Sequence, residues 1–230
     1  MLKGITNEIE KINIGNFSFL SRKDTLDYWV IDEVVNPSMY LRPLEINGDD
    51  VVLDIGANIG IFSVVAGKRA KKVFSYEPDN ENFNVAKGNL KENNIKNCEI
   101  FELGVSGEKC EKTLWLNTKK NRGNHSMQFF NGREALIVKC VGINEVLKLS
   151  NPTKIKIDCE GEEYEILKSV KKWGKVERIV MEWHRKILKD ESNTLFNEII
   201  EKMEKDFEFI GKRDAKGWTQ KLLFIRKKYV

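Results

Sequence analysis

From residue 50 onward, short apolar segments alternate with amphipathic ones, and this alternation restricts the possible folds more than any other feature of the chain. Residues 51–55 read Val-Val-Leu-Asp-Ile, which is typical of a strand buried on both faces. Apolar segments at 73–76 and 98–103 follow, and segments with helical spacing at 59–70 and 79–93 separate the three. Strands and helices that alternate at this interval indicate βαβ units and a parallel sheet.

The second half of the chain continues this pattern and then changes it. We expect strands at 135–141, 155–158 and 176–183, and helices at 144–149, 162–172 and 193–205. The last two apolar segments, 207–212 and 221–226, are typical of a closing antiparallel pair. The chain is therefore predicted to be an α/β protein with a mostly parallel seven-stranded sheet and a C-terminal antiparallel hairpin.

Residues 1–49 precede the regular pattern, and we predict that they form a small appendage to a domain spanning 50–230. Residues 12–21 alternate around Gly15-Asn16, which indicates a short hairpin. Residues 24–36 begin with a potential capping residue, Asp24, and end before Pro37, so we expect a helix there.

Charge and cysteine content argue against several functions. Lys and Arg number 39 against 35 Asp and Glu, and the basic residues are scattered among acids, so a nucleic-acid partner is not expected. The four cysteines form no CxxC pair, which disfavours zinc and favours buried thiols in a reducing compartment. Neither a signal peptide nor an apolar run approaching ~18 residues is evident, so we expect a cytoplasmic protein without a membrane partner.

The turn after the first apolar segment indicates a nucleoside ligand without a pyrophosphate. It reads Asp54-Ile-Gly56-Ala-Asn58-Ile-Gly60, in which Gly56 permits a tight turn and Gly60 permits a close approach of helix and strand. A dinucleotide-binding turn needs glycine where Asn58 stands, because the chain approaches the pyrophosphate there. Asp54 would also repel phosphate, whereas it suits a ligand with ammonium and sulfonium groups, such as S-adenosylmethionine.

The second strand ends in Glu77-Pro78, 21 residues after Gly56. A carboxylate at this distance from the glycine turn is well placed to accept hydrogen bonds from ribose hydroxyls. Glu77 is therefore predicted to bind the sugar of the nucleoside.

Three segments of the chain resemble the FkbM family of S-adenosylmethionine-dependent methyltransferases. They are residues 54–60, residues 76–78 (Tyr-Glu-Pro), and residues 155–163, which read Ile-Lys-Ile-Asp-Cys-Glu-Gly-Glu-Glu; Glu182 continues the resemblance. The similarity extends over about residues 33–185. It implies a Rossmann-like class I methyltransferase fold and O-methylation of sugars or polyketide-type natural products.

The resemblance also implies cofactor-binding roles for particular residues. Asp54, Gly56, Asn58 and Gly60 would line the methionine end of S-adenosylmethionine. Glu77, followed by Pro78, would bind the ribose. Gly104 and Val105 match the segment that often flanks the adenine in such enzymes.

A second group of polar residues follows the later strands and is predicted to perform the chemistry. Methyl transfer from a sulfonium is an in-line displacement, so the protein positions the acceptor and helps to remove its proton. Asp158 and Glu160 follow one strand, and Glu182 and His184 end the next strand on one face. We expect this cluster to orient and deprotonate a hydroxyl, and such ligands also suit Mg²⁺ or Mn²⁺, although the residues establish no metal. Glu163 is expected only to open the following helix, where the macrodipole favours acids.

Two further segments are candidates for contacts with bound molecules. Tyr40 and Arg42, just before the main pattern, would either close over the cofactor or pack against the N-terminal helix. The polar loop at 119–133 would contact the acceptor through Arg122, His125 and Arg133.

We predict an S-adenosylmethionine-dependent O-methyltransferase that acts on a hydroxyl of a sugar or glycan. The alternatives are a methyltransferase of another small metabolite or of nucleic acid, and a cofactor-binding scaffold without activity. Methyltransferases of base amines typically carry Asn/Asp-Pro-Pro-Tyr/Phe after the fourth strand, where this chain has Asp158-Cys159-Glu160-Gly161. Asn58 disfavours a nicotinamide-dependent oxidoreductase. The acceptor, the metal requirement and the oligomeric state do not follow from these patterns.

Overall fold

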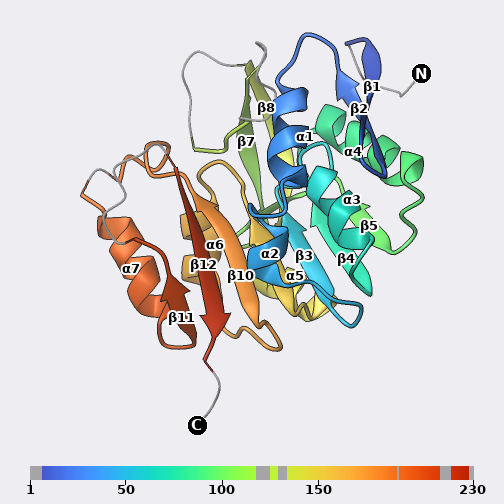
Figure 1. The fold of residues 1–230 in the computed structure, drawn as a ribbon. Helices are drawn as coiled ribbons and strands as arrows, with labels where there is room; N and C mark the ends of the chain where they lie inside the picture. Colours follow the sequence, from blue (N-terminus) through green and yellow to red (C-terminus); the bar gives the residue numbers. More distant parts are fainter. Residues whose placement is uncertain (1–6, 118–124, 129–133, 191, 213–218, 228–230) are drawn as a thin grey trace.

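A seven-stranded, mostly parallel sheet forms the centre of the protein in a computed structural model, which describes residues 7–117, 125–128, 134–190, 192–212 and 219–227 (Figure 1). The strand order is β11-β12-β10-β9-β3-β4-β5. Five strands run parallel: β3 (Val51–Ile55), β4 (Lys72–Tyr76), β5 (Cys98–Phe101), β9 (Lys154–Ile157) and β10 (Arg178–Trp183). An antiparallel pair, β11 (Phe207–Ile210) and β12 (Gln220–Arg226), completes the sheet beside β10. The predicted sheet and its C-terminal hairpin are thereby confirmed.

Helices cover both faces of the sheet, so side chains along each strand alternate between two cores. One face carries α1 (Asp27–Val35), α3 (Ile61–Gly67) and α4 (Asn80–Glu92), and the other carries α5 (Ile143–Ser150), α6 (Glu163–Ser169) and α7 (Thr194–Met203) (Figure 1). In β3, Val52 packs in the first core and Leu53 in the second. None of the helices in the described ranges combines the length and apolar composition that crossing a bilayer requires.

A smaller three-stranded sheet, which the sequence did not predict, lies apart from the main one. It consists of β6 (Gly104–Ser106), β7 (Cys110–Leu116) and β8 (Glu134–Gly142), in the order β6-β8-β7. In the second half of β8, the buried Val138 and Cys140 flank the exposed Lys139. This alternation is typical of a sheet with one solvated face, unlike the continuously buried strands of the main sheet.

The N-terminal segment forms the predicted hairpin, with β1 (Ile9–Ile14) paired antiparallel to β2 (Phe17–Arg22). The following helix, α1, begins at Asp27, so Asp24 does not cap it. Asp24 adopts a left-handed conformation (φ 61°), and the Thr25 hydroxyl accepts from the Asp27 N–H instead. A short helix that the sequence did not predict, α2 (Leu41–Leu44), leads into β3.

Two asparagine side chains from the end of α4 bind the backbone of β2 along the edge that is not paired with β1. Asn89 Oδ1 accepts from Leu20 N at 2.6 Å, and its Nδ2 donates to Leu20 O at 3.3 Å. Asn93 makes the same pair of bonds with Ser18, at 3.0 and 2.7 Å. Each amide carries one carbonyl and one amino group, so it substitutes for the peptide group of a neighbouring strand. The hairpin is thus docked on the main domain by polar groups as well as by apolar packing.

Candidate active site

The carboxyl ends of four parallel strands surround a cavity of about 420 Å³, a volume within the range of small-molecule sites. Turns after β3, β4 and β9 and the end of β10 supply most of its polar wall. All but two of the residues proposed for cofactor binding or for the chemistry line it: Tyr40, Gly56, Asn58, Glu77, Pro78, Gly104, Val105, Asp158, Glu160, Glu182 and His184. The parallel topology therefore brings the two predicted groups of residues into one site.

Asp54 and Gly60 are the two proposed cofactor-binding residues outside the lining. Asp54 is fully buried, accepts from Ser63 Oγ at 2.6 Å, and lies 3.3 Å from Lys156 Nζ. Gly60 has φ 77°, and a Cβ there would lie 2.8 Å from Ala86 Cβ of α4. The glycine therefore permits close packing between helices and not, as expected, between helix and strand. Both residues shape the turn from behind the cavity wall.

Gly56 is where the turn after β3 meets the turn after β9. It adopts φ 78°, and a Cβ at this position would lie 1.8 Å from the Asp158 carbonyl oxygen. The Gly56 carbonyl accepts from Lys156 Nζ at 2.6 Å. Only glycine fits here, because both the conformation and the space exclude a side chain.

Glu77 lies at the end of β4, buried beneath the turn that contains Asn58. Its Oε2 accepts from Asn58 N at 2.8 Å, and its Oε1 accepts from Asp79 N at 3.0 Å. Burial and the neighbouring Asp79 charge raise the pKa of Glu77 to about 7, although these donors lower it. The carboxylate therefore changes its charge near neutral pH.

His184 is the centre of the predicted catalytic cluster. Its Nε2 lies 3.4 Å from Glu160 Oε2 and 3.8 Å from Asp158 Oδ1. Its Nδ1 donates to Glu163 Oε1 at 2.9 Å. The structure thus brings His184, Glu160 and Asp158 together as predicted, and Glu182 lies farther along the same wall.

Glu163 does more than open helix α6, contrary to the expectation from the sequence. Its side chain is fully buried, and it accepts from Cys159 N at 3.1 Å and from Gly161 N at 3.0 Å in addition to His184. The turn that it holds contains two left-handed residues, Glu160 (φ 52°) and Gly161 (φ 105°). Glu163 therefore fixes both the turn that carries Glu160 and the ring of His184.

The cluster contains groups whose affinities for protons differ widely. Burial lowers the pKa of His184, but Glu163, Glu160 and Asp158 outweigh burial and hold it well above its usual value. Burial raises the pKa of Glu160 to about 8. Burial also acts to raise the pKa of Asp158, yet Lys156 and His184 hold it below its usual value. At neutral pH the cluster therefore combines an imidazolium, a protonated carboxyl and a carboxylate.

Tyr40 lies between α1 and α2 and reaches the same cluster. Its hydroxyl donates to Asp158 Oδ2 at 3.2 Å, and its ring faces Lys156 Nζ at 5.8 Å and Lys221 Nζ at 4.8 Å. Arg42 is exposed outside the lining, where its Nη1 donates to Ser38 Oγ at 3.4 Å. Of the two alternatives given for Arg42, this position favours packing beside the N-terminal helix over closure on the cofactor.

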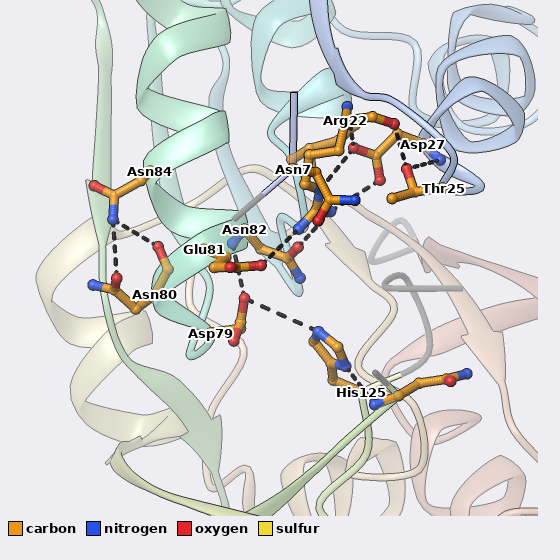
Figure 2. A network of polar contacts seen from close by, with 12 residues as sticks. Asn7, Arg22, Thr25, Asp27, Asp79, Asn80, Glu81, Asn82, Asn84 and His125 are labelled. Atoms are coloured by element: carbon orange, nitrogen blue, oxygen red, sulfur yellow. Dashed lines mark hydrogen bonds and ion pairs between the residues drawn. The ribbon is translucent and has the colours of Figure 1, made fainter. Parts of the chain in front are cut away.

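Only part of the predicted polar loop belongs to the described residues, and Arg122 and Arg133 lie outside them. His125 and Met127 line the cavity beside Pro78 and Gly104. His125 Nε2 lies 4.0 Å from Asp79 Oδ1 (Figure 2). The structure therefore places His125 at the predicted nucleoside end of the cavity, whereas the sequence suggested the acceptor.

Two buried charged residues of the lining were missed, Lys156 and Glu162. Lys156 lies within the buried strand β9. A lysine in such an apolar run indicates a buried charge that needs an acidic partner, and this signal is present in the sequence. Burial lowers its pKa, but Asp54 and Asp158 raise it above the usual value. Glu162 accepts from Ser106 Oγ, Gln128 Nε2 and Lys112 Nζ, and so ties β6, β7 and the loop to the acidic turn.

The sheet order, the glycine turn and the strand-end carboxylates together define a class I S-adenosylmethionine-dependent methyltransferase. The model of the methyltransferase FkbM domain matches residues 54–210, which is more than half of the chain. The chain therefore belongs to the FkbM methyltransferase family.

Solved structures share this fold at low sequence identity. The crystal structure of methyltransferase FkbM from Methylobacillus flagellatus superposes with a TM-score of 0.52 at 16% identity, over 77% of this chain and 43% of that one. A dimethyladenosine transferase from Plasmodium falciparum gives a TM-score of 0.50 at 12% identity, over 86% and 62%.

Curated relatives match over shorter segments. An uncharacterized RNA methyltransferase from Clostridium tetani is 34% identical over 96 residues, which are 40% of this chain and 20% of that protein. A probable cobalt-precorrin-6B C(15)-methyltransferase (decarboxylating) from Methanococcus maripaludis is 41% identical over 58 residues, or 25% and 32%. The matches span a third or less of these relatives, so their substrates are not carried over.

Proposed function

We propose that this methyltransferase transfers the methyl group of S-adenosylmethionine to a hydroxyl of a sugar or glycan. The observation that carries the proposal is the contact between Glu160 and His184 inside the cavity that holds the predicted cofactor residues. An alcohol has a high pKa, so it gains from a base at the moment of attack. Glu160 meets this requirement, because its carboxylate binds a proton tightly and the neighbouring His184 imidazolium stays charged.

Each member of the cluster has a distinct role in this proposal. Ionised Glu160 accepts the hydroxyl proton while the oxygen attacks the methyl carbon and the carbon–sulfur bond breaks. The His184 imidazolium balances the charge of Glu160, and Glu163 holds its ring. Asp158, fixed by Tyr40, accepts a hydrogen bond from a neighbouring hydroxyl of the acceptor. Glu182 borders the same space.

The charge of the cavity supports a small polyhydroxyl acceptor over a nucleic acid. Six acidic side chains line the cavity, those of Glu33, Glu77, Asp158, Glu160, Glu162 and Glu182. The nearest lysines are engaged: Lys221 contacts Glu33 at 2.5 Å, and Lys156 pairs with Asp54 and Asp158. A phosphate backbone would therefore meet a mostly acidic cavity wall, whereas nucleic-acid sites are positive.

A panel of acceptors tests this proposal. We expect release of S-adenosylhomocysteine, with a methylated product seen by mass spectrometry, in the presence of neutral sugars or glycans. Phosphorylated sugars and total cellular RNA should give no product, and the Glu160→Gln variant serves as the inactive control. Methylation of RNA without methylation of any hydroxyl compound would refute the proposed acceptor class.

A divalent cation is the second candidate occupant of the cluster, and we propose that Asp158, Glu160 and His184 would bind it. Each offers one ligand atom, and these atoms lie within 4.8 Å of one another. Glu163 on the other ring nitrogen of His184 is the arrangement that orients histidine toward a metal. A bound Mg²⁺ or Mn²⁺ would displace the Nε2 proton of His184, because only a neutral imidazole coordinates a metal, and would lower the pKa of the acceptor hydroxyl.

Binding of Mn²⁺ alone, followed by electron paramagnetic resonance, tests the metal proposal. Asp158→Asn is expected to weaken Mn²⁺ binding at least about 10-fold, the lower bound for loss of an outer-shell partner, because a neutral amide replaces a charged carboxylate ligand. Glu182→Gln, a carboxylate outside the ligand set, is the matched control and should leave the affinity unchanged. If wild-type protein binds no Mn²⁺ at millimolar concentration, the metal proposal fails while the proton-accepting role of Glu160 stands.

A further inference from the structure

A chain of buried polar contacts links the N-terminal hairpin to Glu77. Figure 2 shows the first part of this chain, in which Arg22 contacts Asp27 and Asn82. Arg22, the last residue of β2, is buried, and its Nε and Nη2 donate to the two carboxylate oxygens of Asp27 at 2.8 and 2.9 Å. Arg22 Nη2 also donates to Asn82 Oδ1 at 2.8 Å. Asn82, on the first turn of α4, donates through Nδ2 to Glu77 Oε1 at 3.4 Å. The guanidinium therefore reaches the predicted ribose-binding carboxylate through a single side chain.

Arg22 determines which end of the Asn82 amide faces Glu77. A guanidinium carries donors and no acceptor, so the carbonyl end of the amide must face it. The amino end is then directed toward the carboxylate. A reversed amide would place the Asn82 carbonyl oxygen against Glu77 Oε1, and these two acceptors would repel each other.

The donor from Asn82 matters because Glu77 is poised between two charge states. Burial and Asp79 raise its pKa to about 7, while the hydrogen bonds from Asp79 N, Asn58 N and the Asn82 side chain lower it. Loss of the Asn82 donor would raise this pKa further. A protonated Glu77 is a poorer acceptor for ribose hydroxyls, so its affinity for the nucleoside would fall at neutral pH.

We propose that Arg22 is a positioning residue for Glu77, acting through Asn82, and that the N-terminal hairpin thereby contributes to cofactor affinity. The inference rests on the proposed ribose-binding role of Glu77. It gives a functional reason for burying the Arg22–Asp27 ion pair, because a buried pair alone adds little to stability.

The Asn82→Asp variant tests the inference with little change of shape. It keeps an acceptor for Arg22 but turns a carboxylate oxygen toward Glu77 where an amino group stood. The affinity for S-adenosylhomocysteine at neutral pH, measured by isothermal titration, should fall about ten-fold, which corresponds to about 1.4 kcal/mol. Binding uses ionised Glu77, so affinity is present above its pKa and is lost as the pH falls. The midpoint of this loss should move upward from the wild-type value of about 7.

Other charged groups near Glu77 must be separated from this effect. Asp79 adjoins it, Arg22 and Glu81 lie on the far side of Asn82, and His125 lies 4.0 Å from Asp79. Histidine is the side chain that most often changes its charge near neutral pH. The pH series is therefore repeated in a His125→Gln background, where the shift caused by Asn82→Asp should persist. A shift that disappears there would overturn the proposal.

Asn93→Ala is the matched control for docking of the hairpin. Asn93 clamps Ser18 of β2 but forms no hydrogen bond with Arg22 or Glu77 in the described part of the chain. This variant should lower the Tm without moving the pH midpoint. An equal shift of the midpoint in Asn93→Ala would mean that general loosening of the hairpin causes the effect, and would overturn the proposal.

Two further variants keep the test decisive. If Asn82→Asp does not fold, Arg22→Lys replaces it as the test. Lysine keeps the positive charge but lacks the forked guanidinium that reaches Asp27 and Asn82 together, so the midpoint should shift in the same direction.

Unchanged affinity in Glu77→Gln would refute the ribose role of Glu77 itself. Weakened binding in Glu77→Gln, with an unmoved midpoint in the folded Asn82 or Arg22 variant, would refute only the positioning role.

Discussion

Replacing Glu160 with glutamine is expected to lower kcat for methyl transfer by about 10²- to 10⁴-fold, the usual contribution of a positioned general base. The amide has the same shape but accepts no proton, so the Kd for S-adenosylmethionine should change little. Glu182→Gln, on the same wall but farther from His184 Nε2, is the matched control and should lose less activity. Equal losses of cofactor affinity and turnover in Glu160→Gln would contradict a role in proton removal.

The pH dependence of the wild-type enzyme provides a second measure of the same role. Glu160 must be ionised to accept a proton, and its pKa is raised to about 8 by burial. We therefore expect kcat to be low at neutral pH and to rise as the pH increases through about 8. His184 remains charged over this range because its pKa lies well above the usual value. A rate that falls through this range would show that the protonated form of the cluster is the active one.

Gly56→Ala is expected to abolish cofactor binding and to destabilise the protein. The left-handed conformation alone costs an alanine about 1–2 kcal/mol. The new Cβ would also lie 1.8 Å from the Asp158 carbonyl oxygen, so the two turns that form the cavity must separate. Urea unfolding gives the loss of stability, and isothermal titration with S-adenosylmethionine gives the loss of binding.

Gly174→Ala is the matched control for this effect. Gly174 also has positive φ (56°), but a Cβ there would meet only Asn151 Oδ1 at 3.8 Å. Its substitution should therefore show the cost of the conformation without that of the overlap, and should leave cofactor binding intact. Similar behaviour of the two variants would mean that the turns around Gly56 adjust easily.

Much of the fold and site followed from short apolar runs and from the polar residues at their ends. The apolar runs of β3, β4, β9 and β10 predicted buried parallel strands, and parallel strands bring their carboxyl ends to one edge. Residues at those ends, such as Glu77 and His184, were therefore predicted to lie at one site. A strand at 135–141 was predicted, but its separate sheet was missed, because β6 has only three residues and the first half of β8 is exposed, so the apolar pattern is weak.

The polar anchors could not be predicted, because a sequence pattern does not select hydrogen-bond partners. Glu163 looks like any acid at a helix start, and only the fold brings it to His184. The asparagines that dock the hairpin are polar residues on a helix, where periodicity arguments expect solvent. Asn89 is nevertheless fully buried. Such contacts depend on tertiary packing and are found only once the elements are assembled.

The amides that clamp β2 also affect how the molecule meets its neighbours. A two-stranded ribbon ordinarily presents free backbone groups that can recruit an extended segment from another chain. The peptide groups of Ser18 and Leu20 are already satisfied by Asn93 and Asn89, so strand addition gains nothing at these positions. The side chains of Asn89 and Asn93 therefore form the hydrogen bonds that a third strand would form, and they protect this edge of β2 against aggregation.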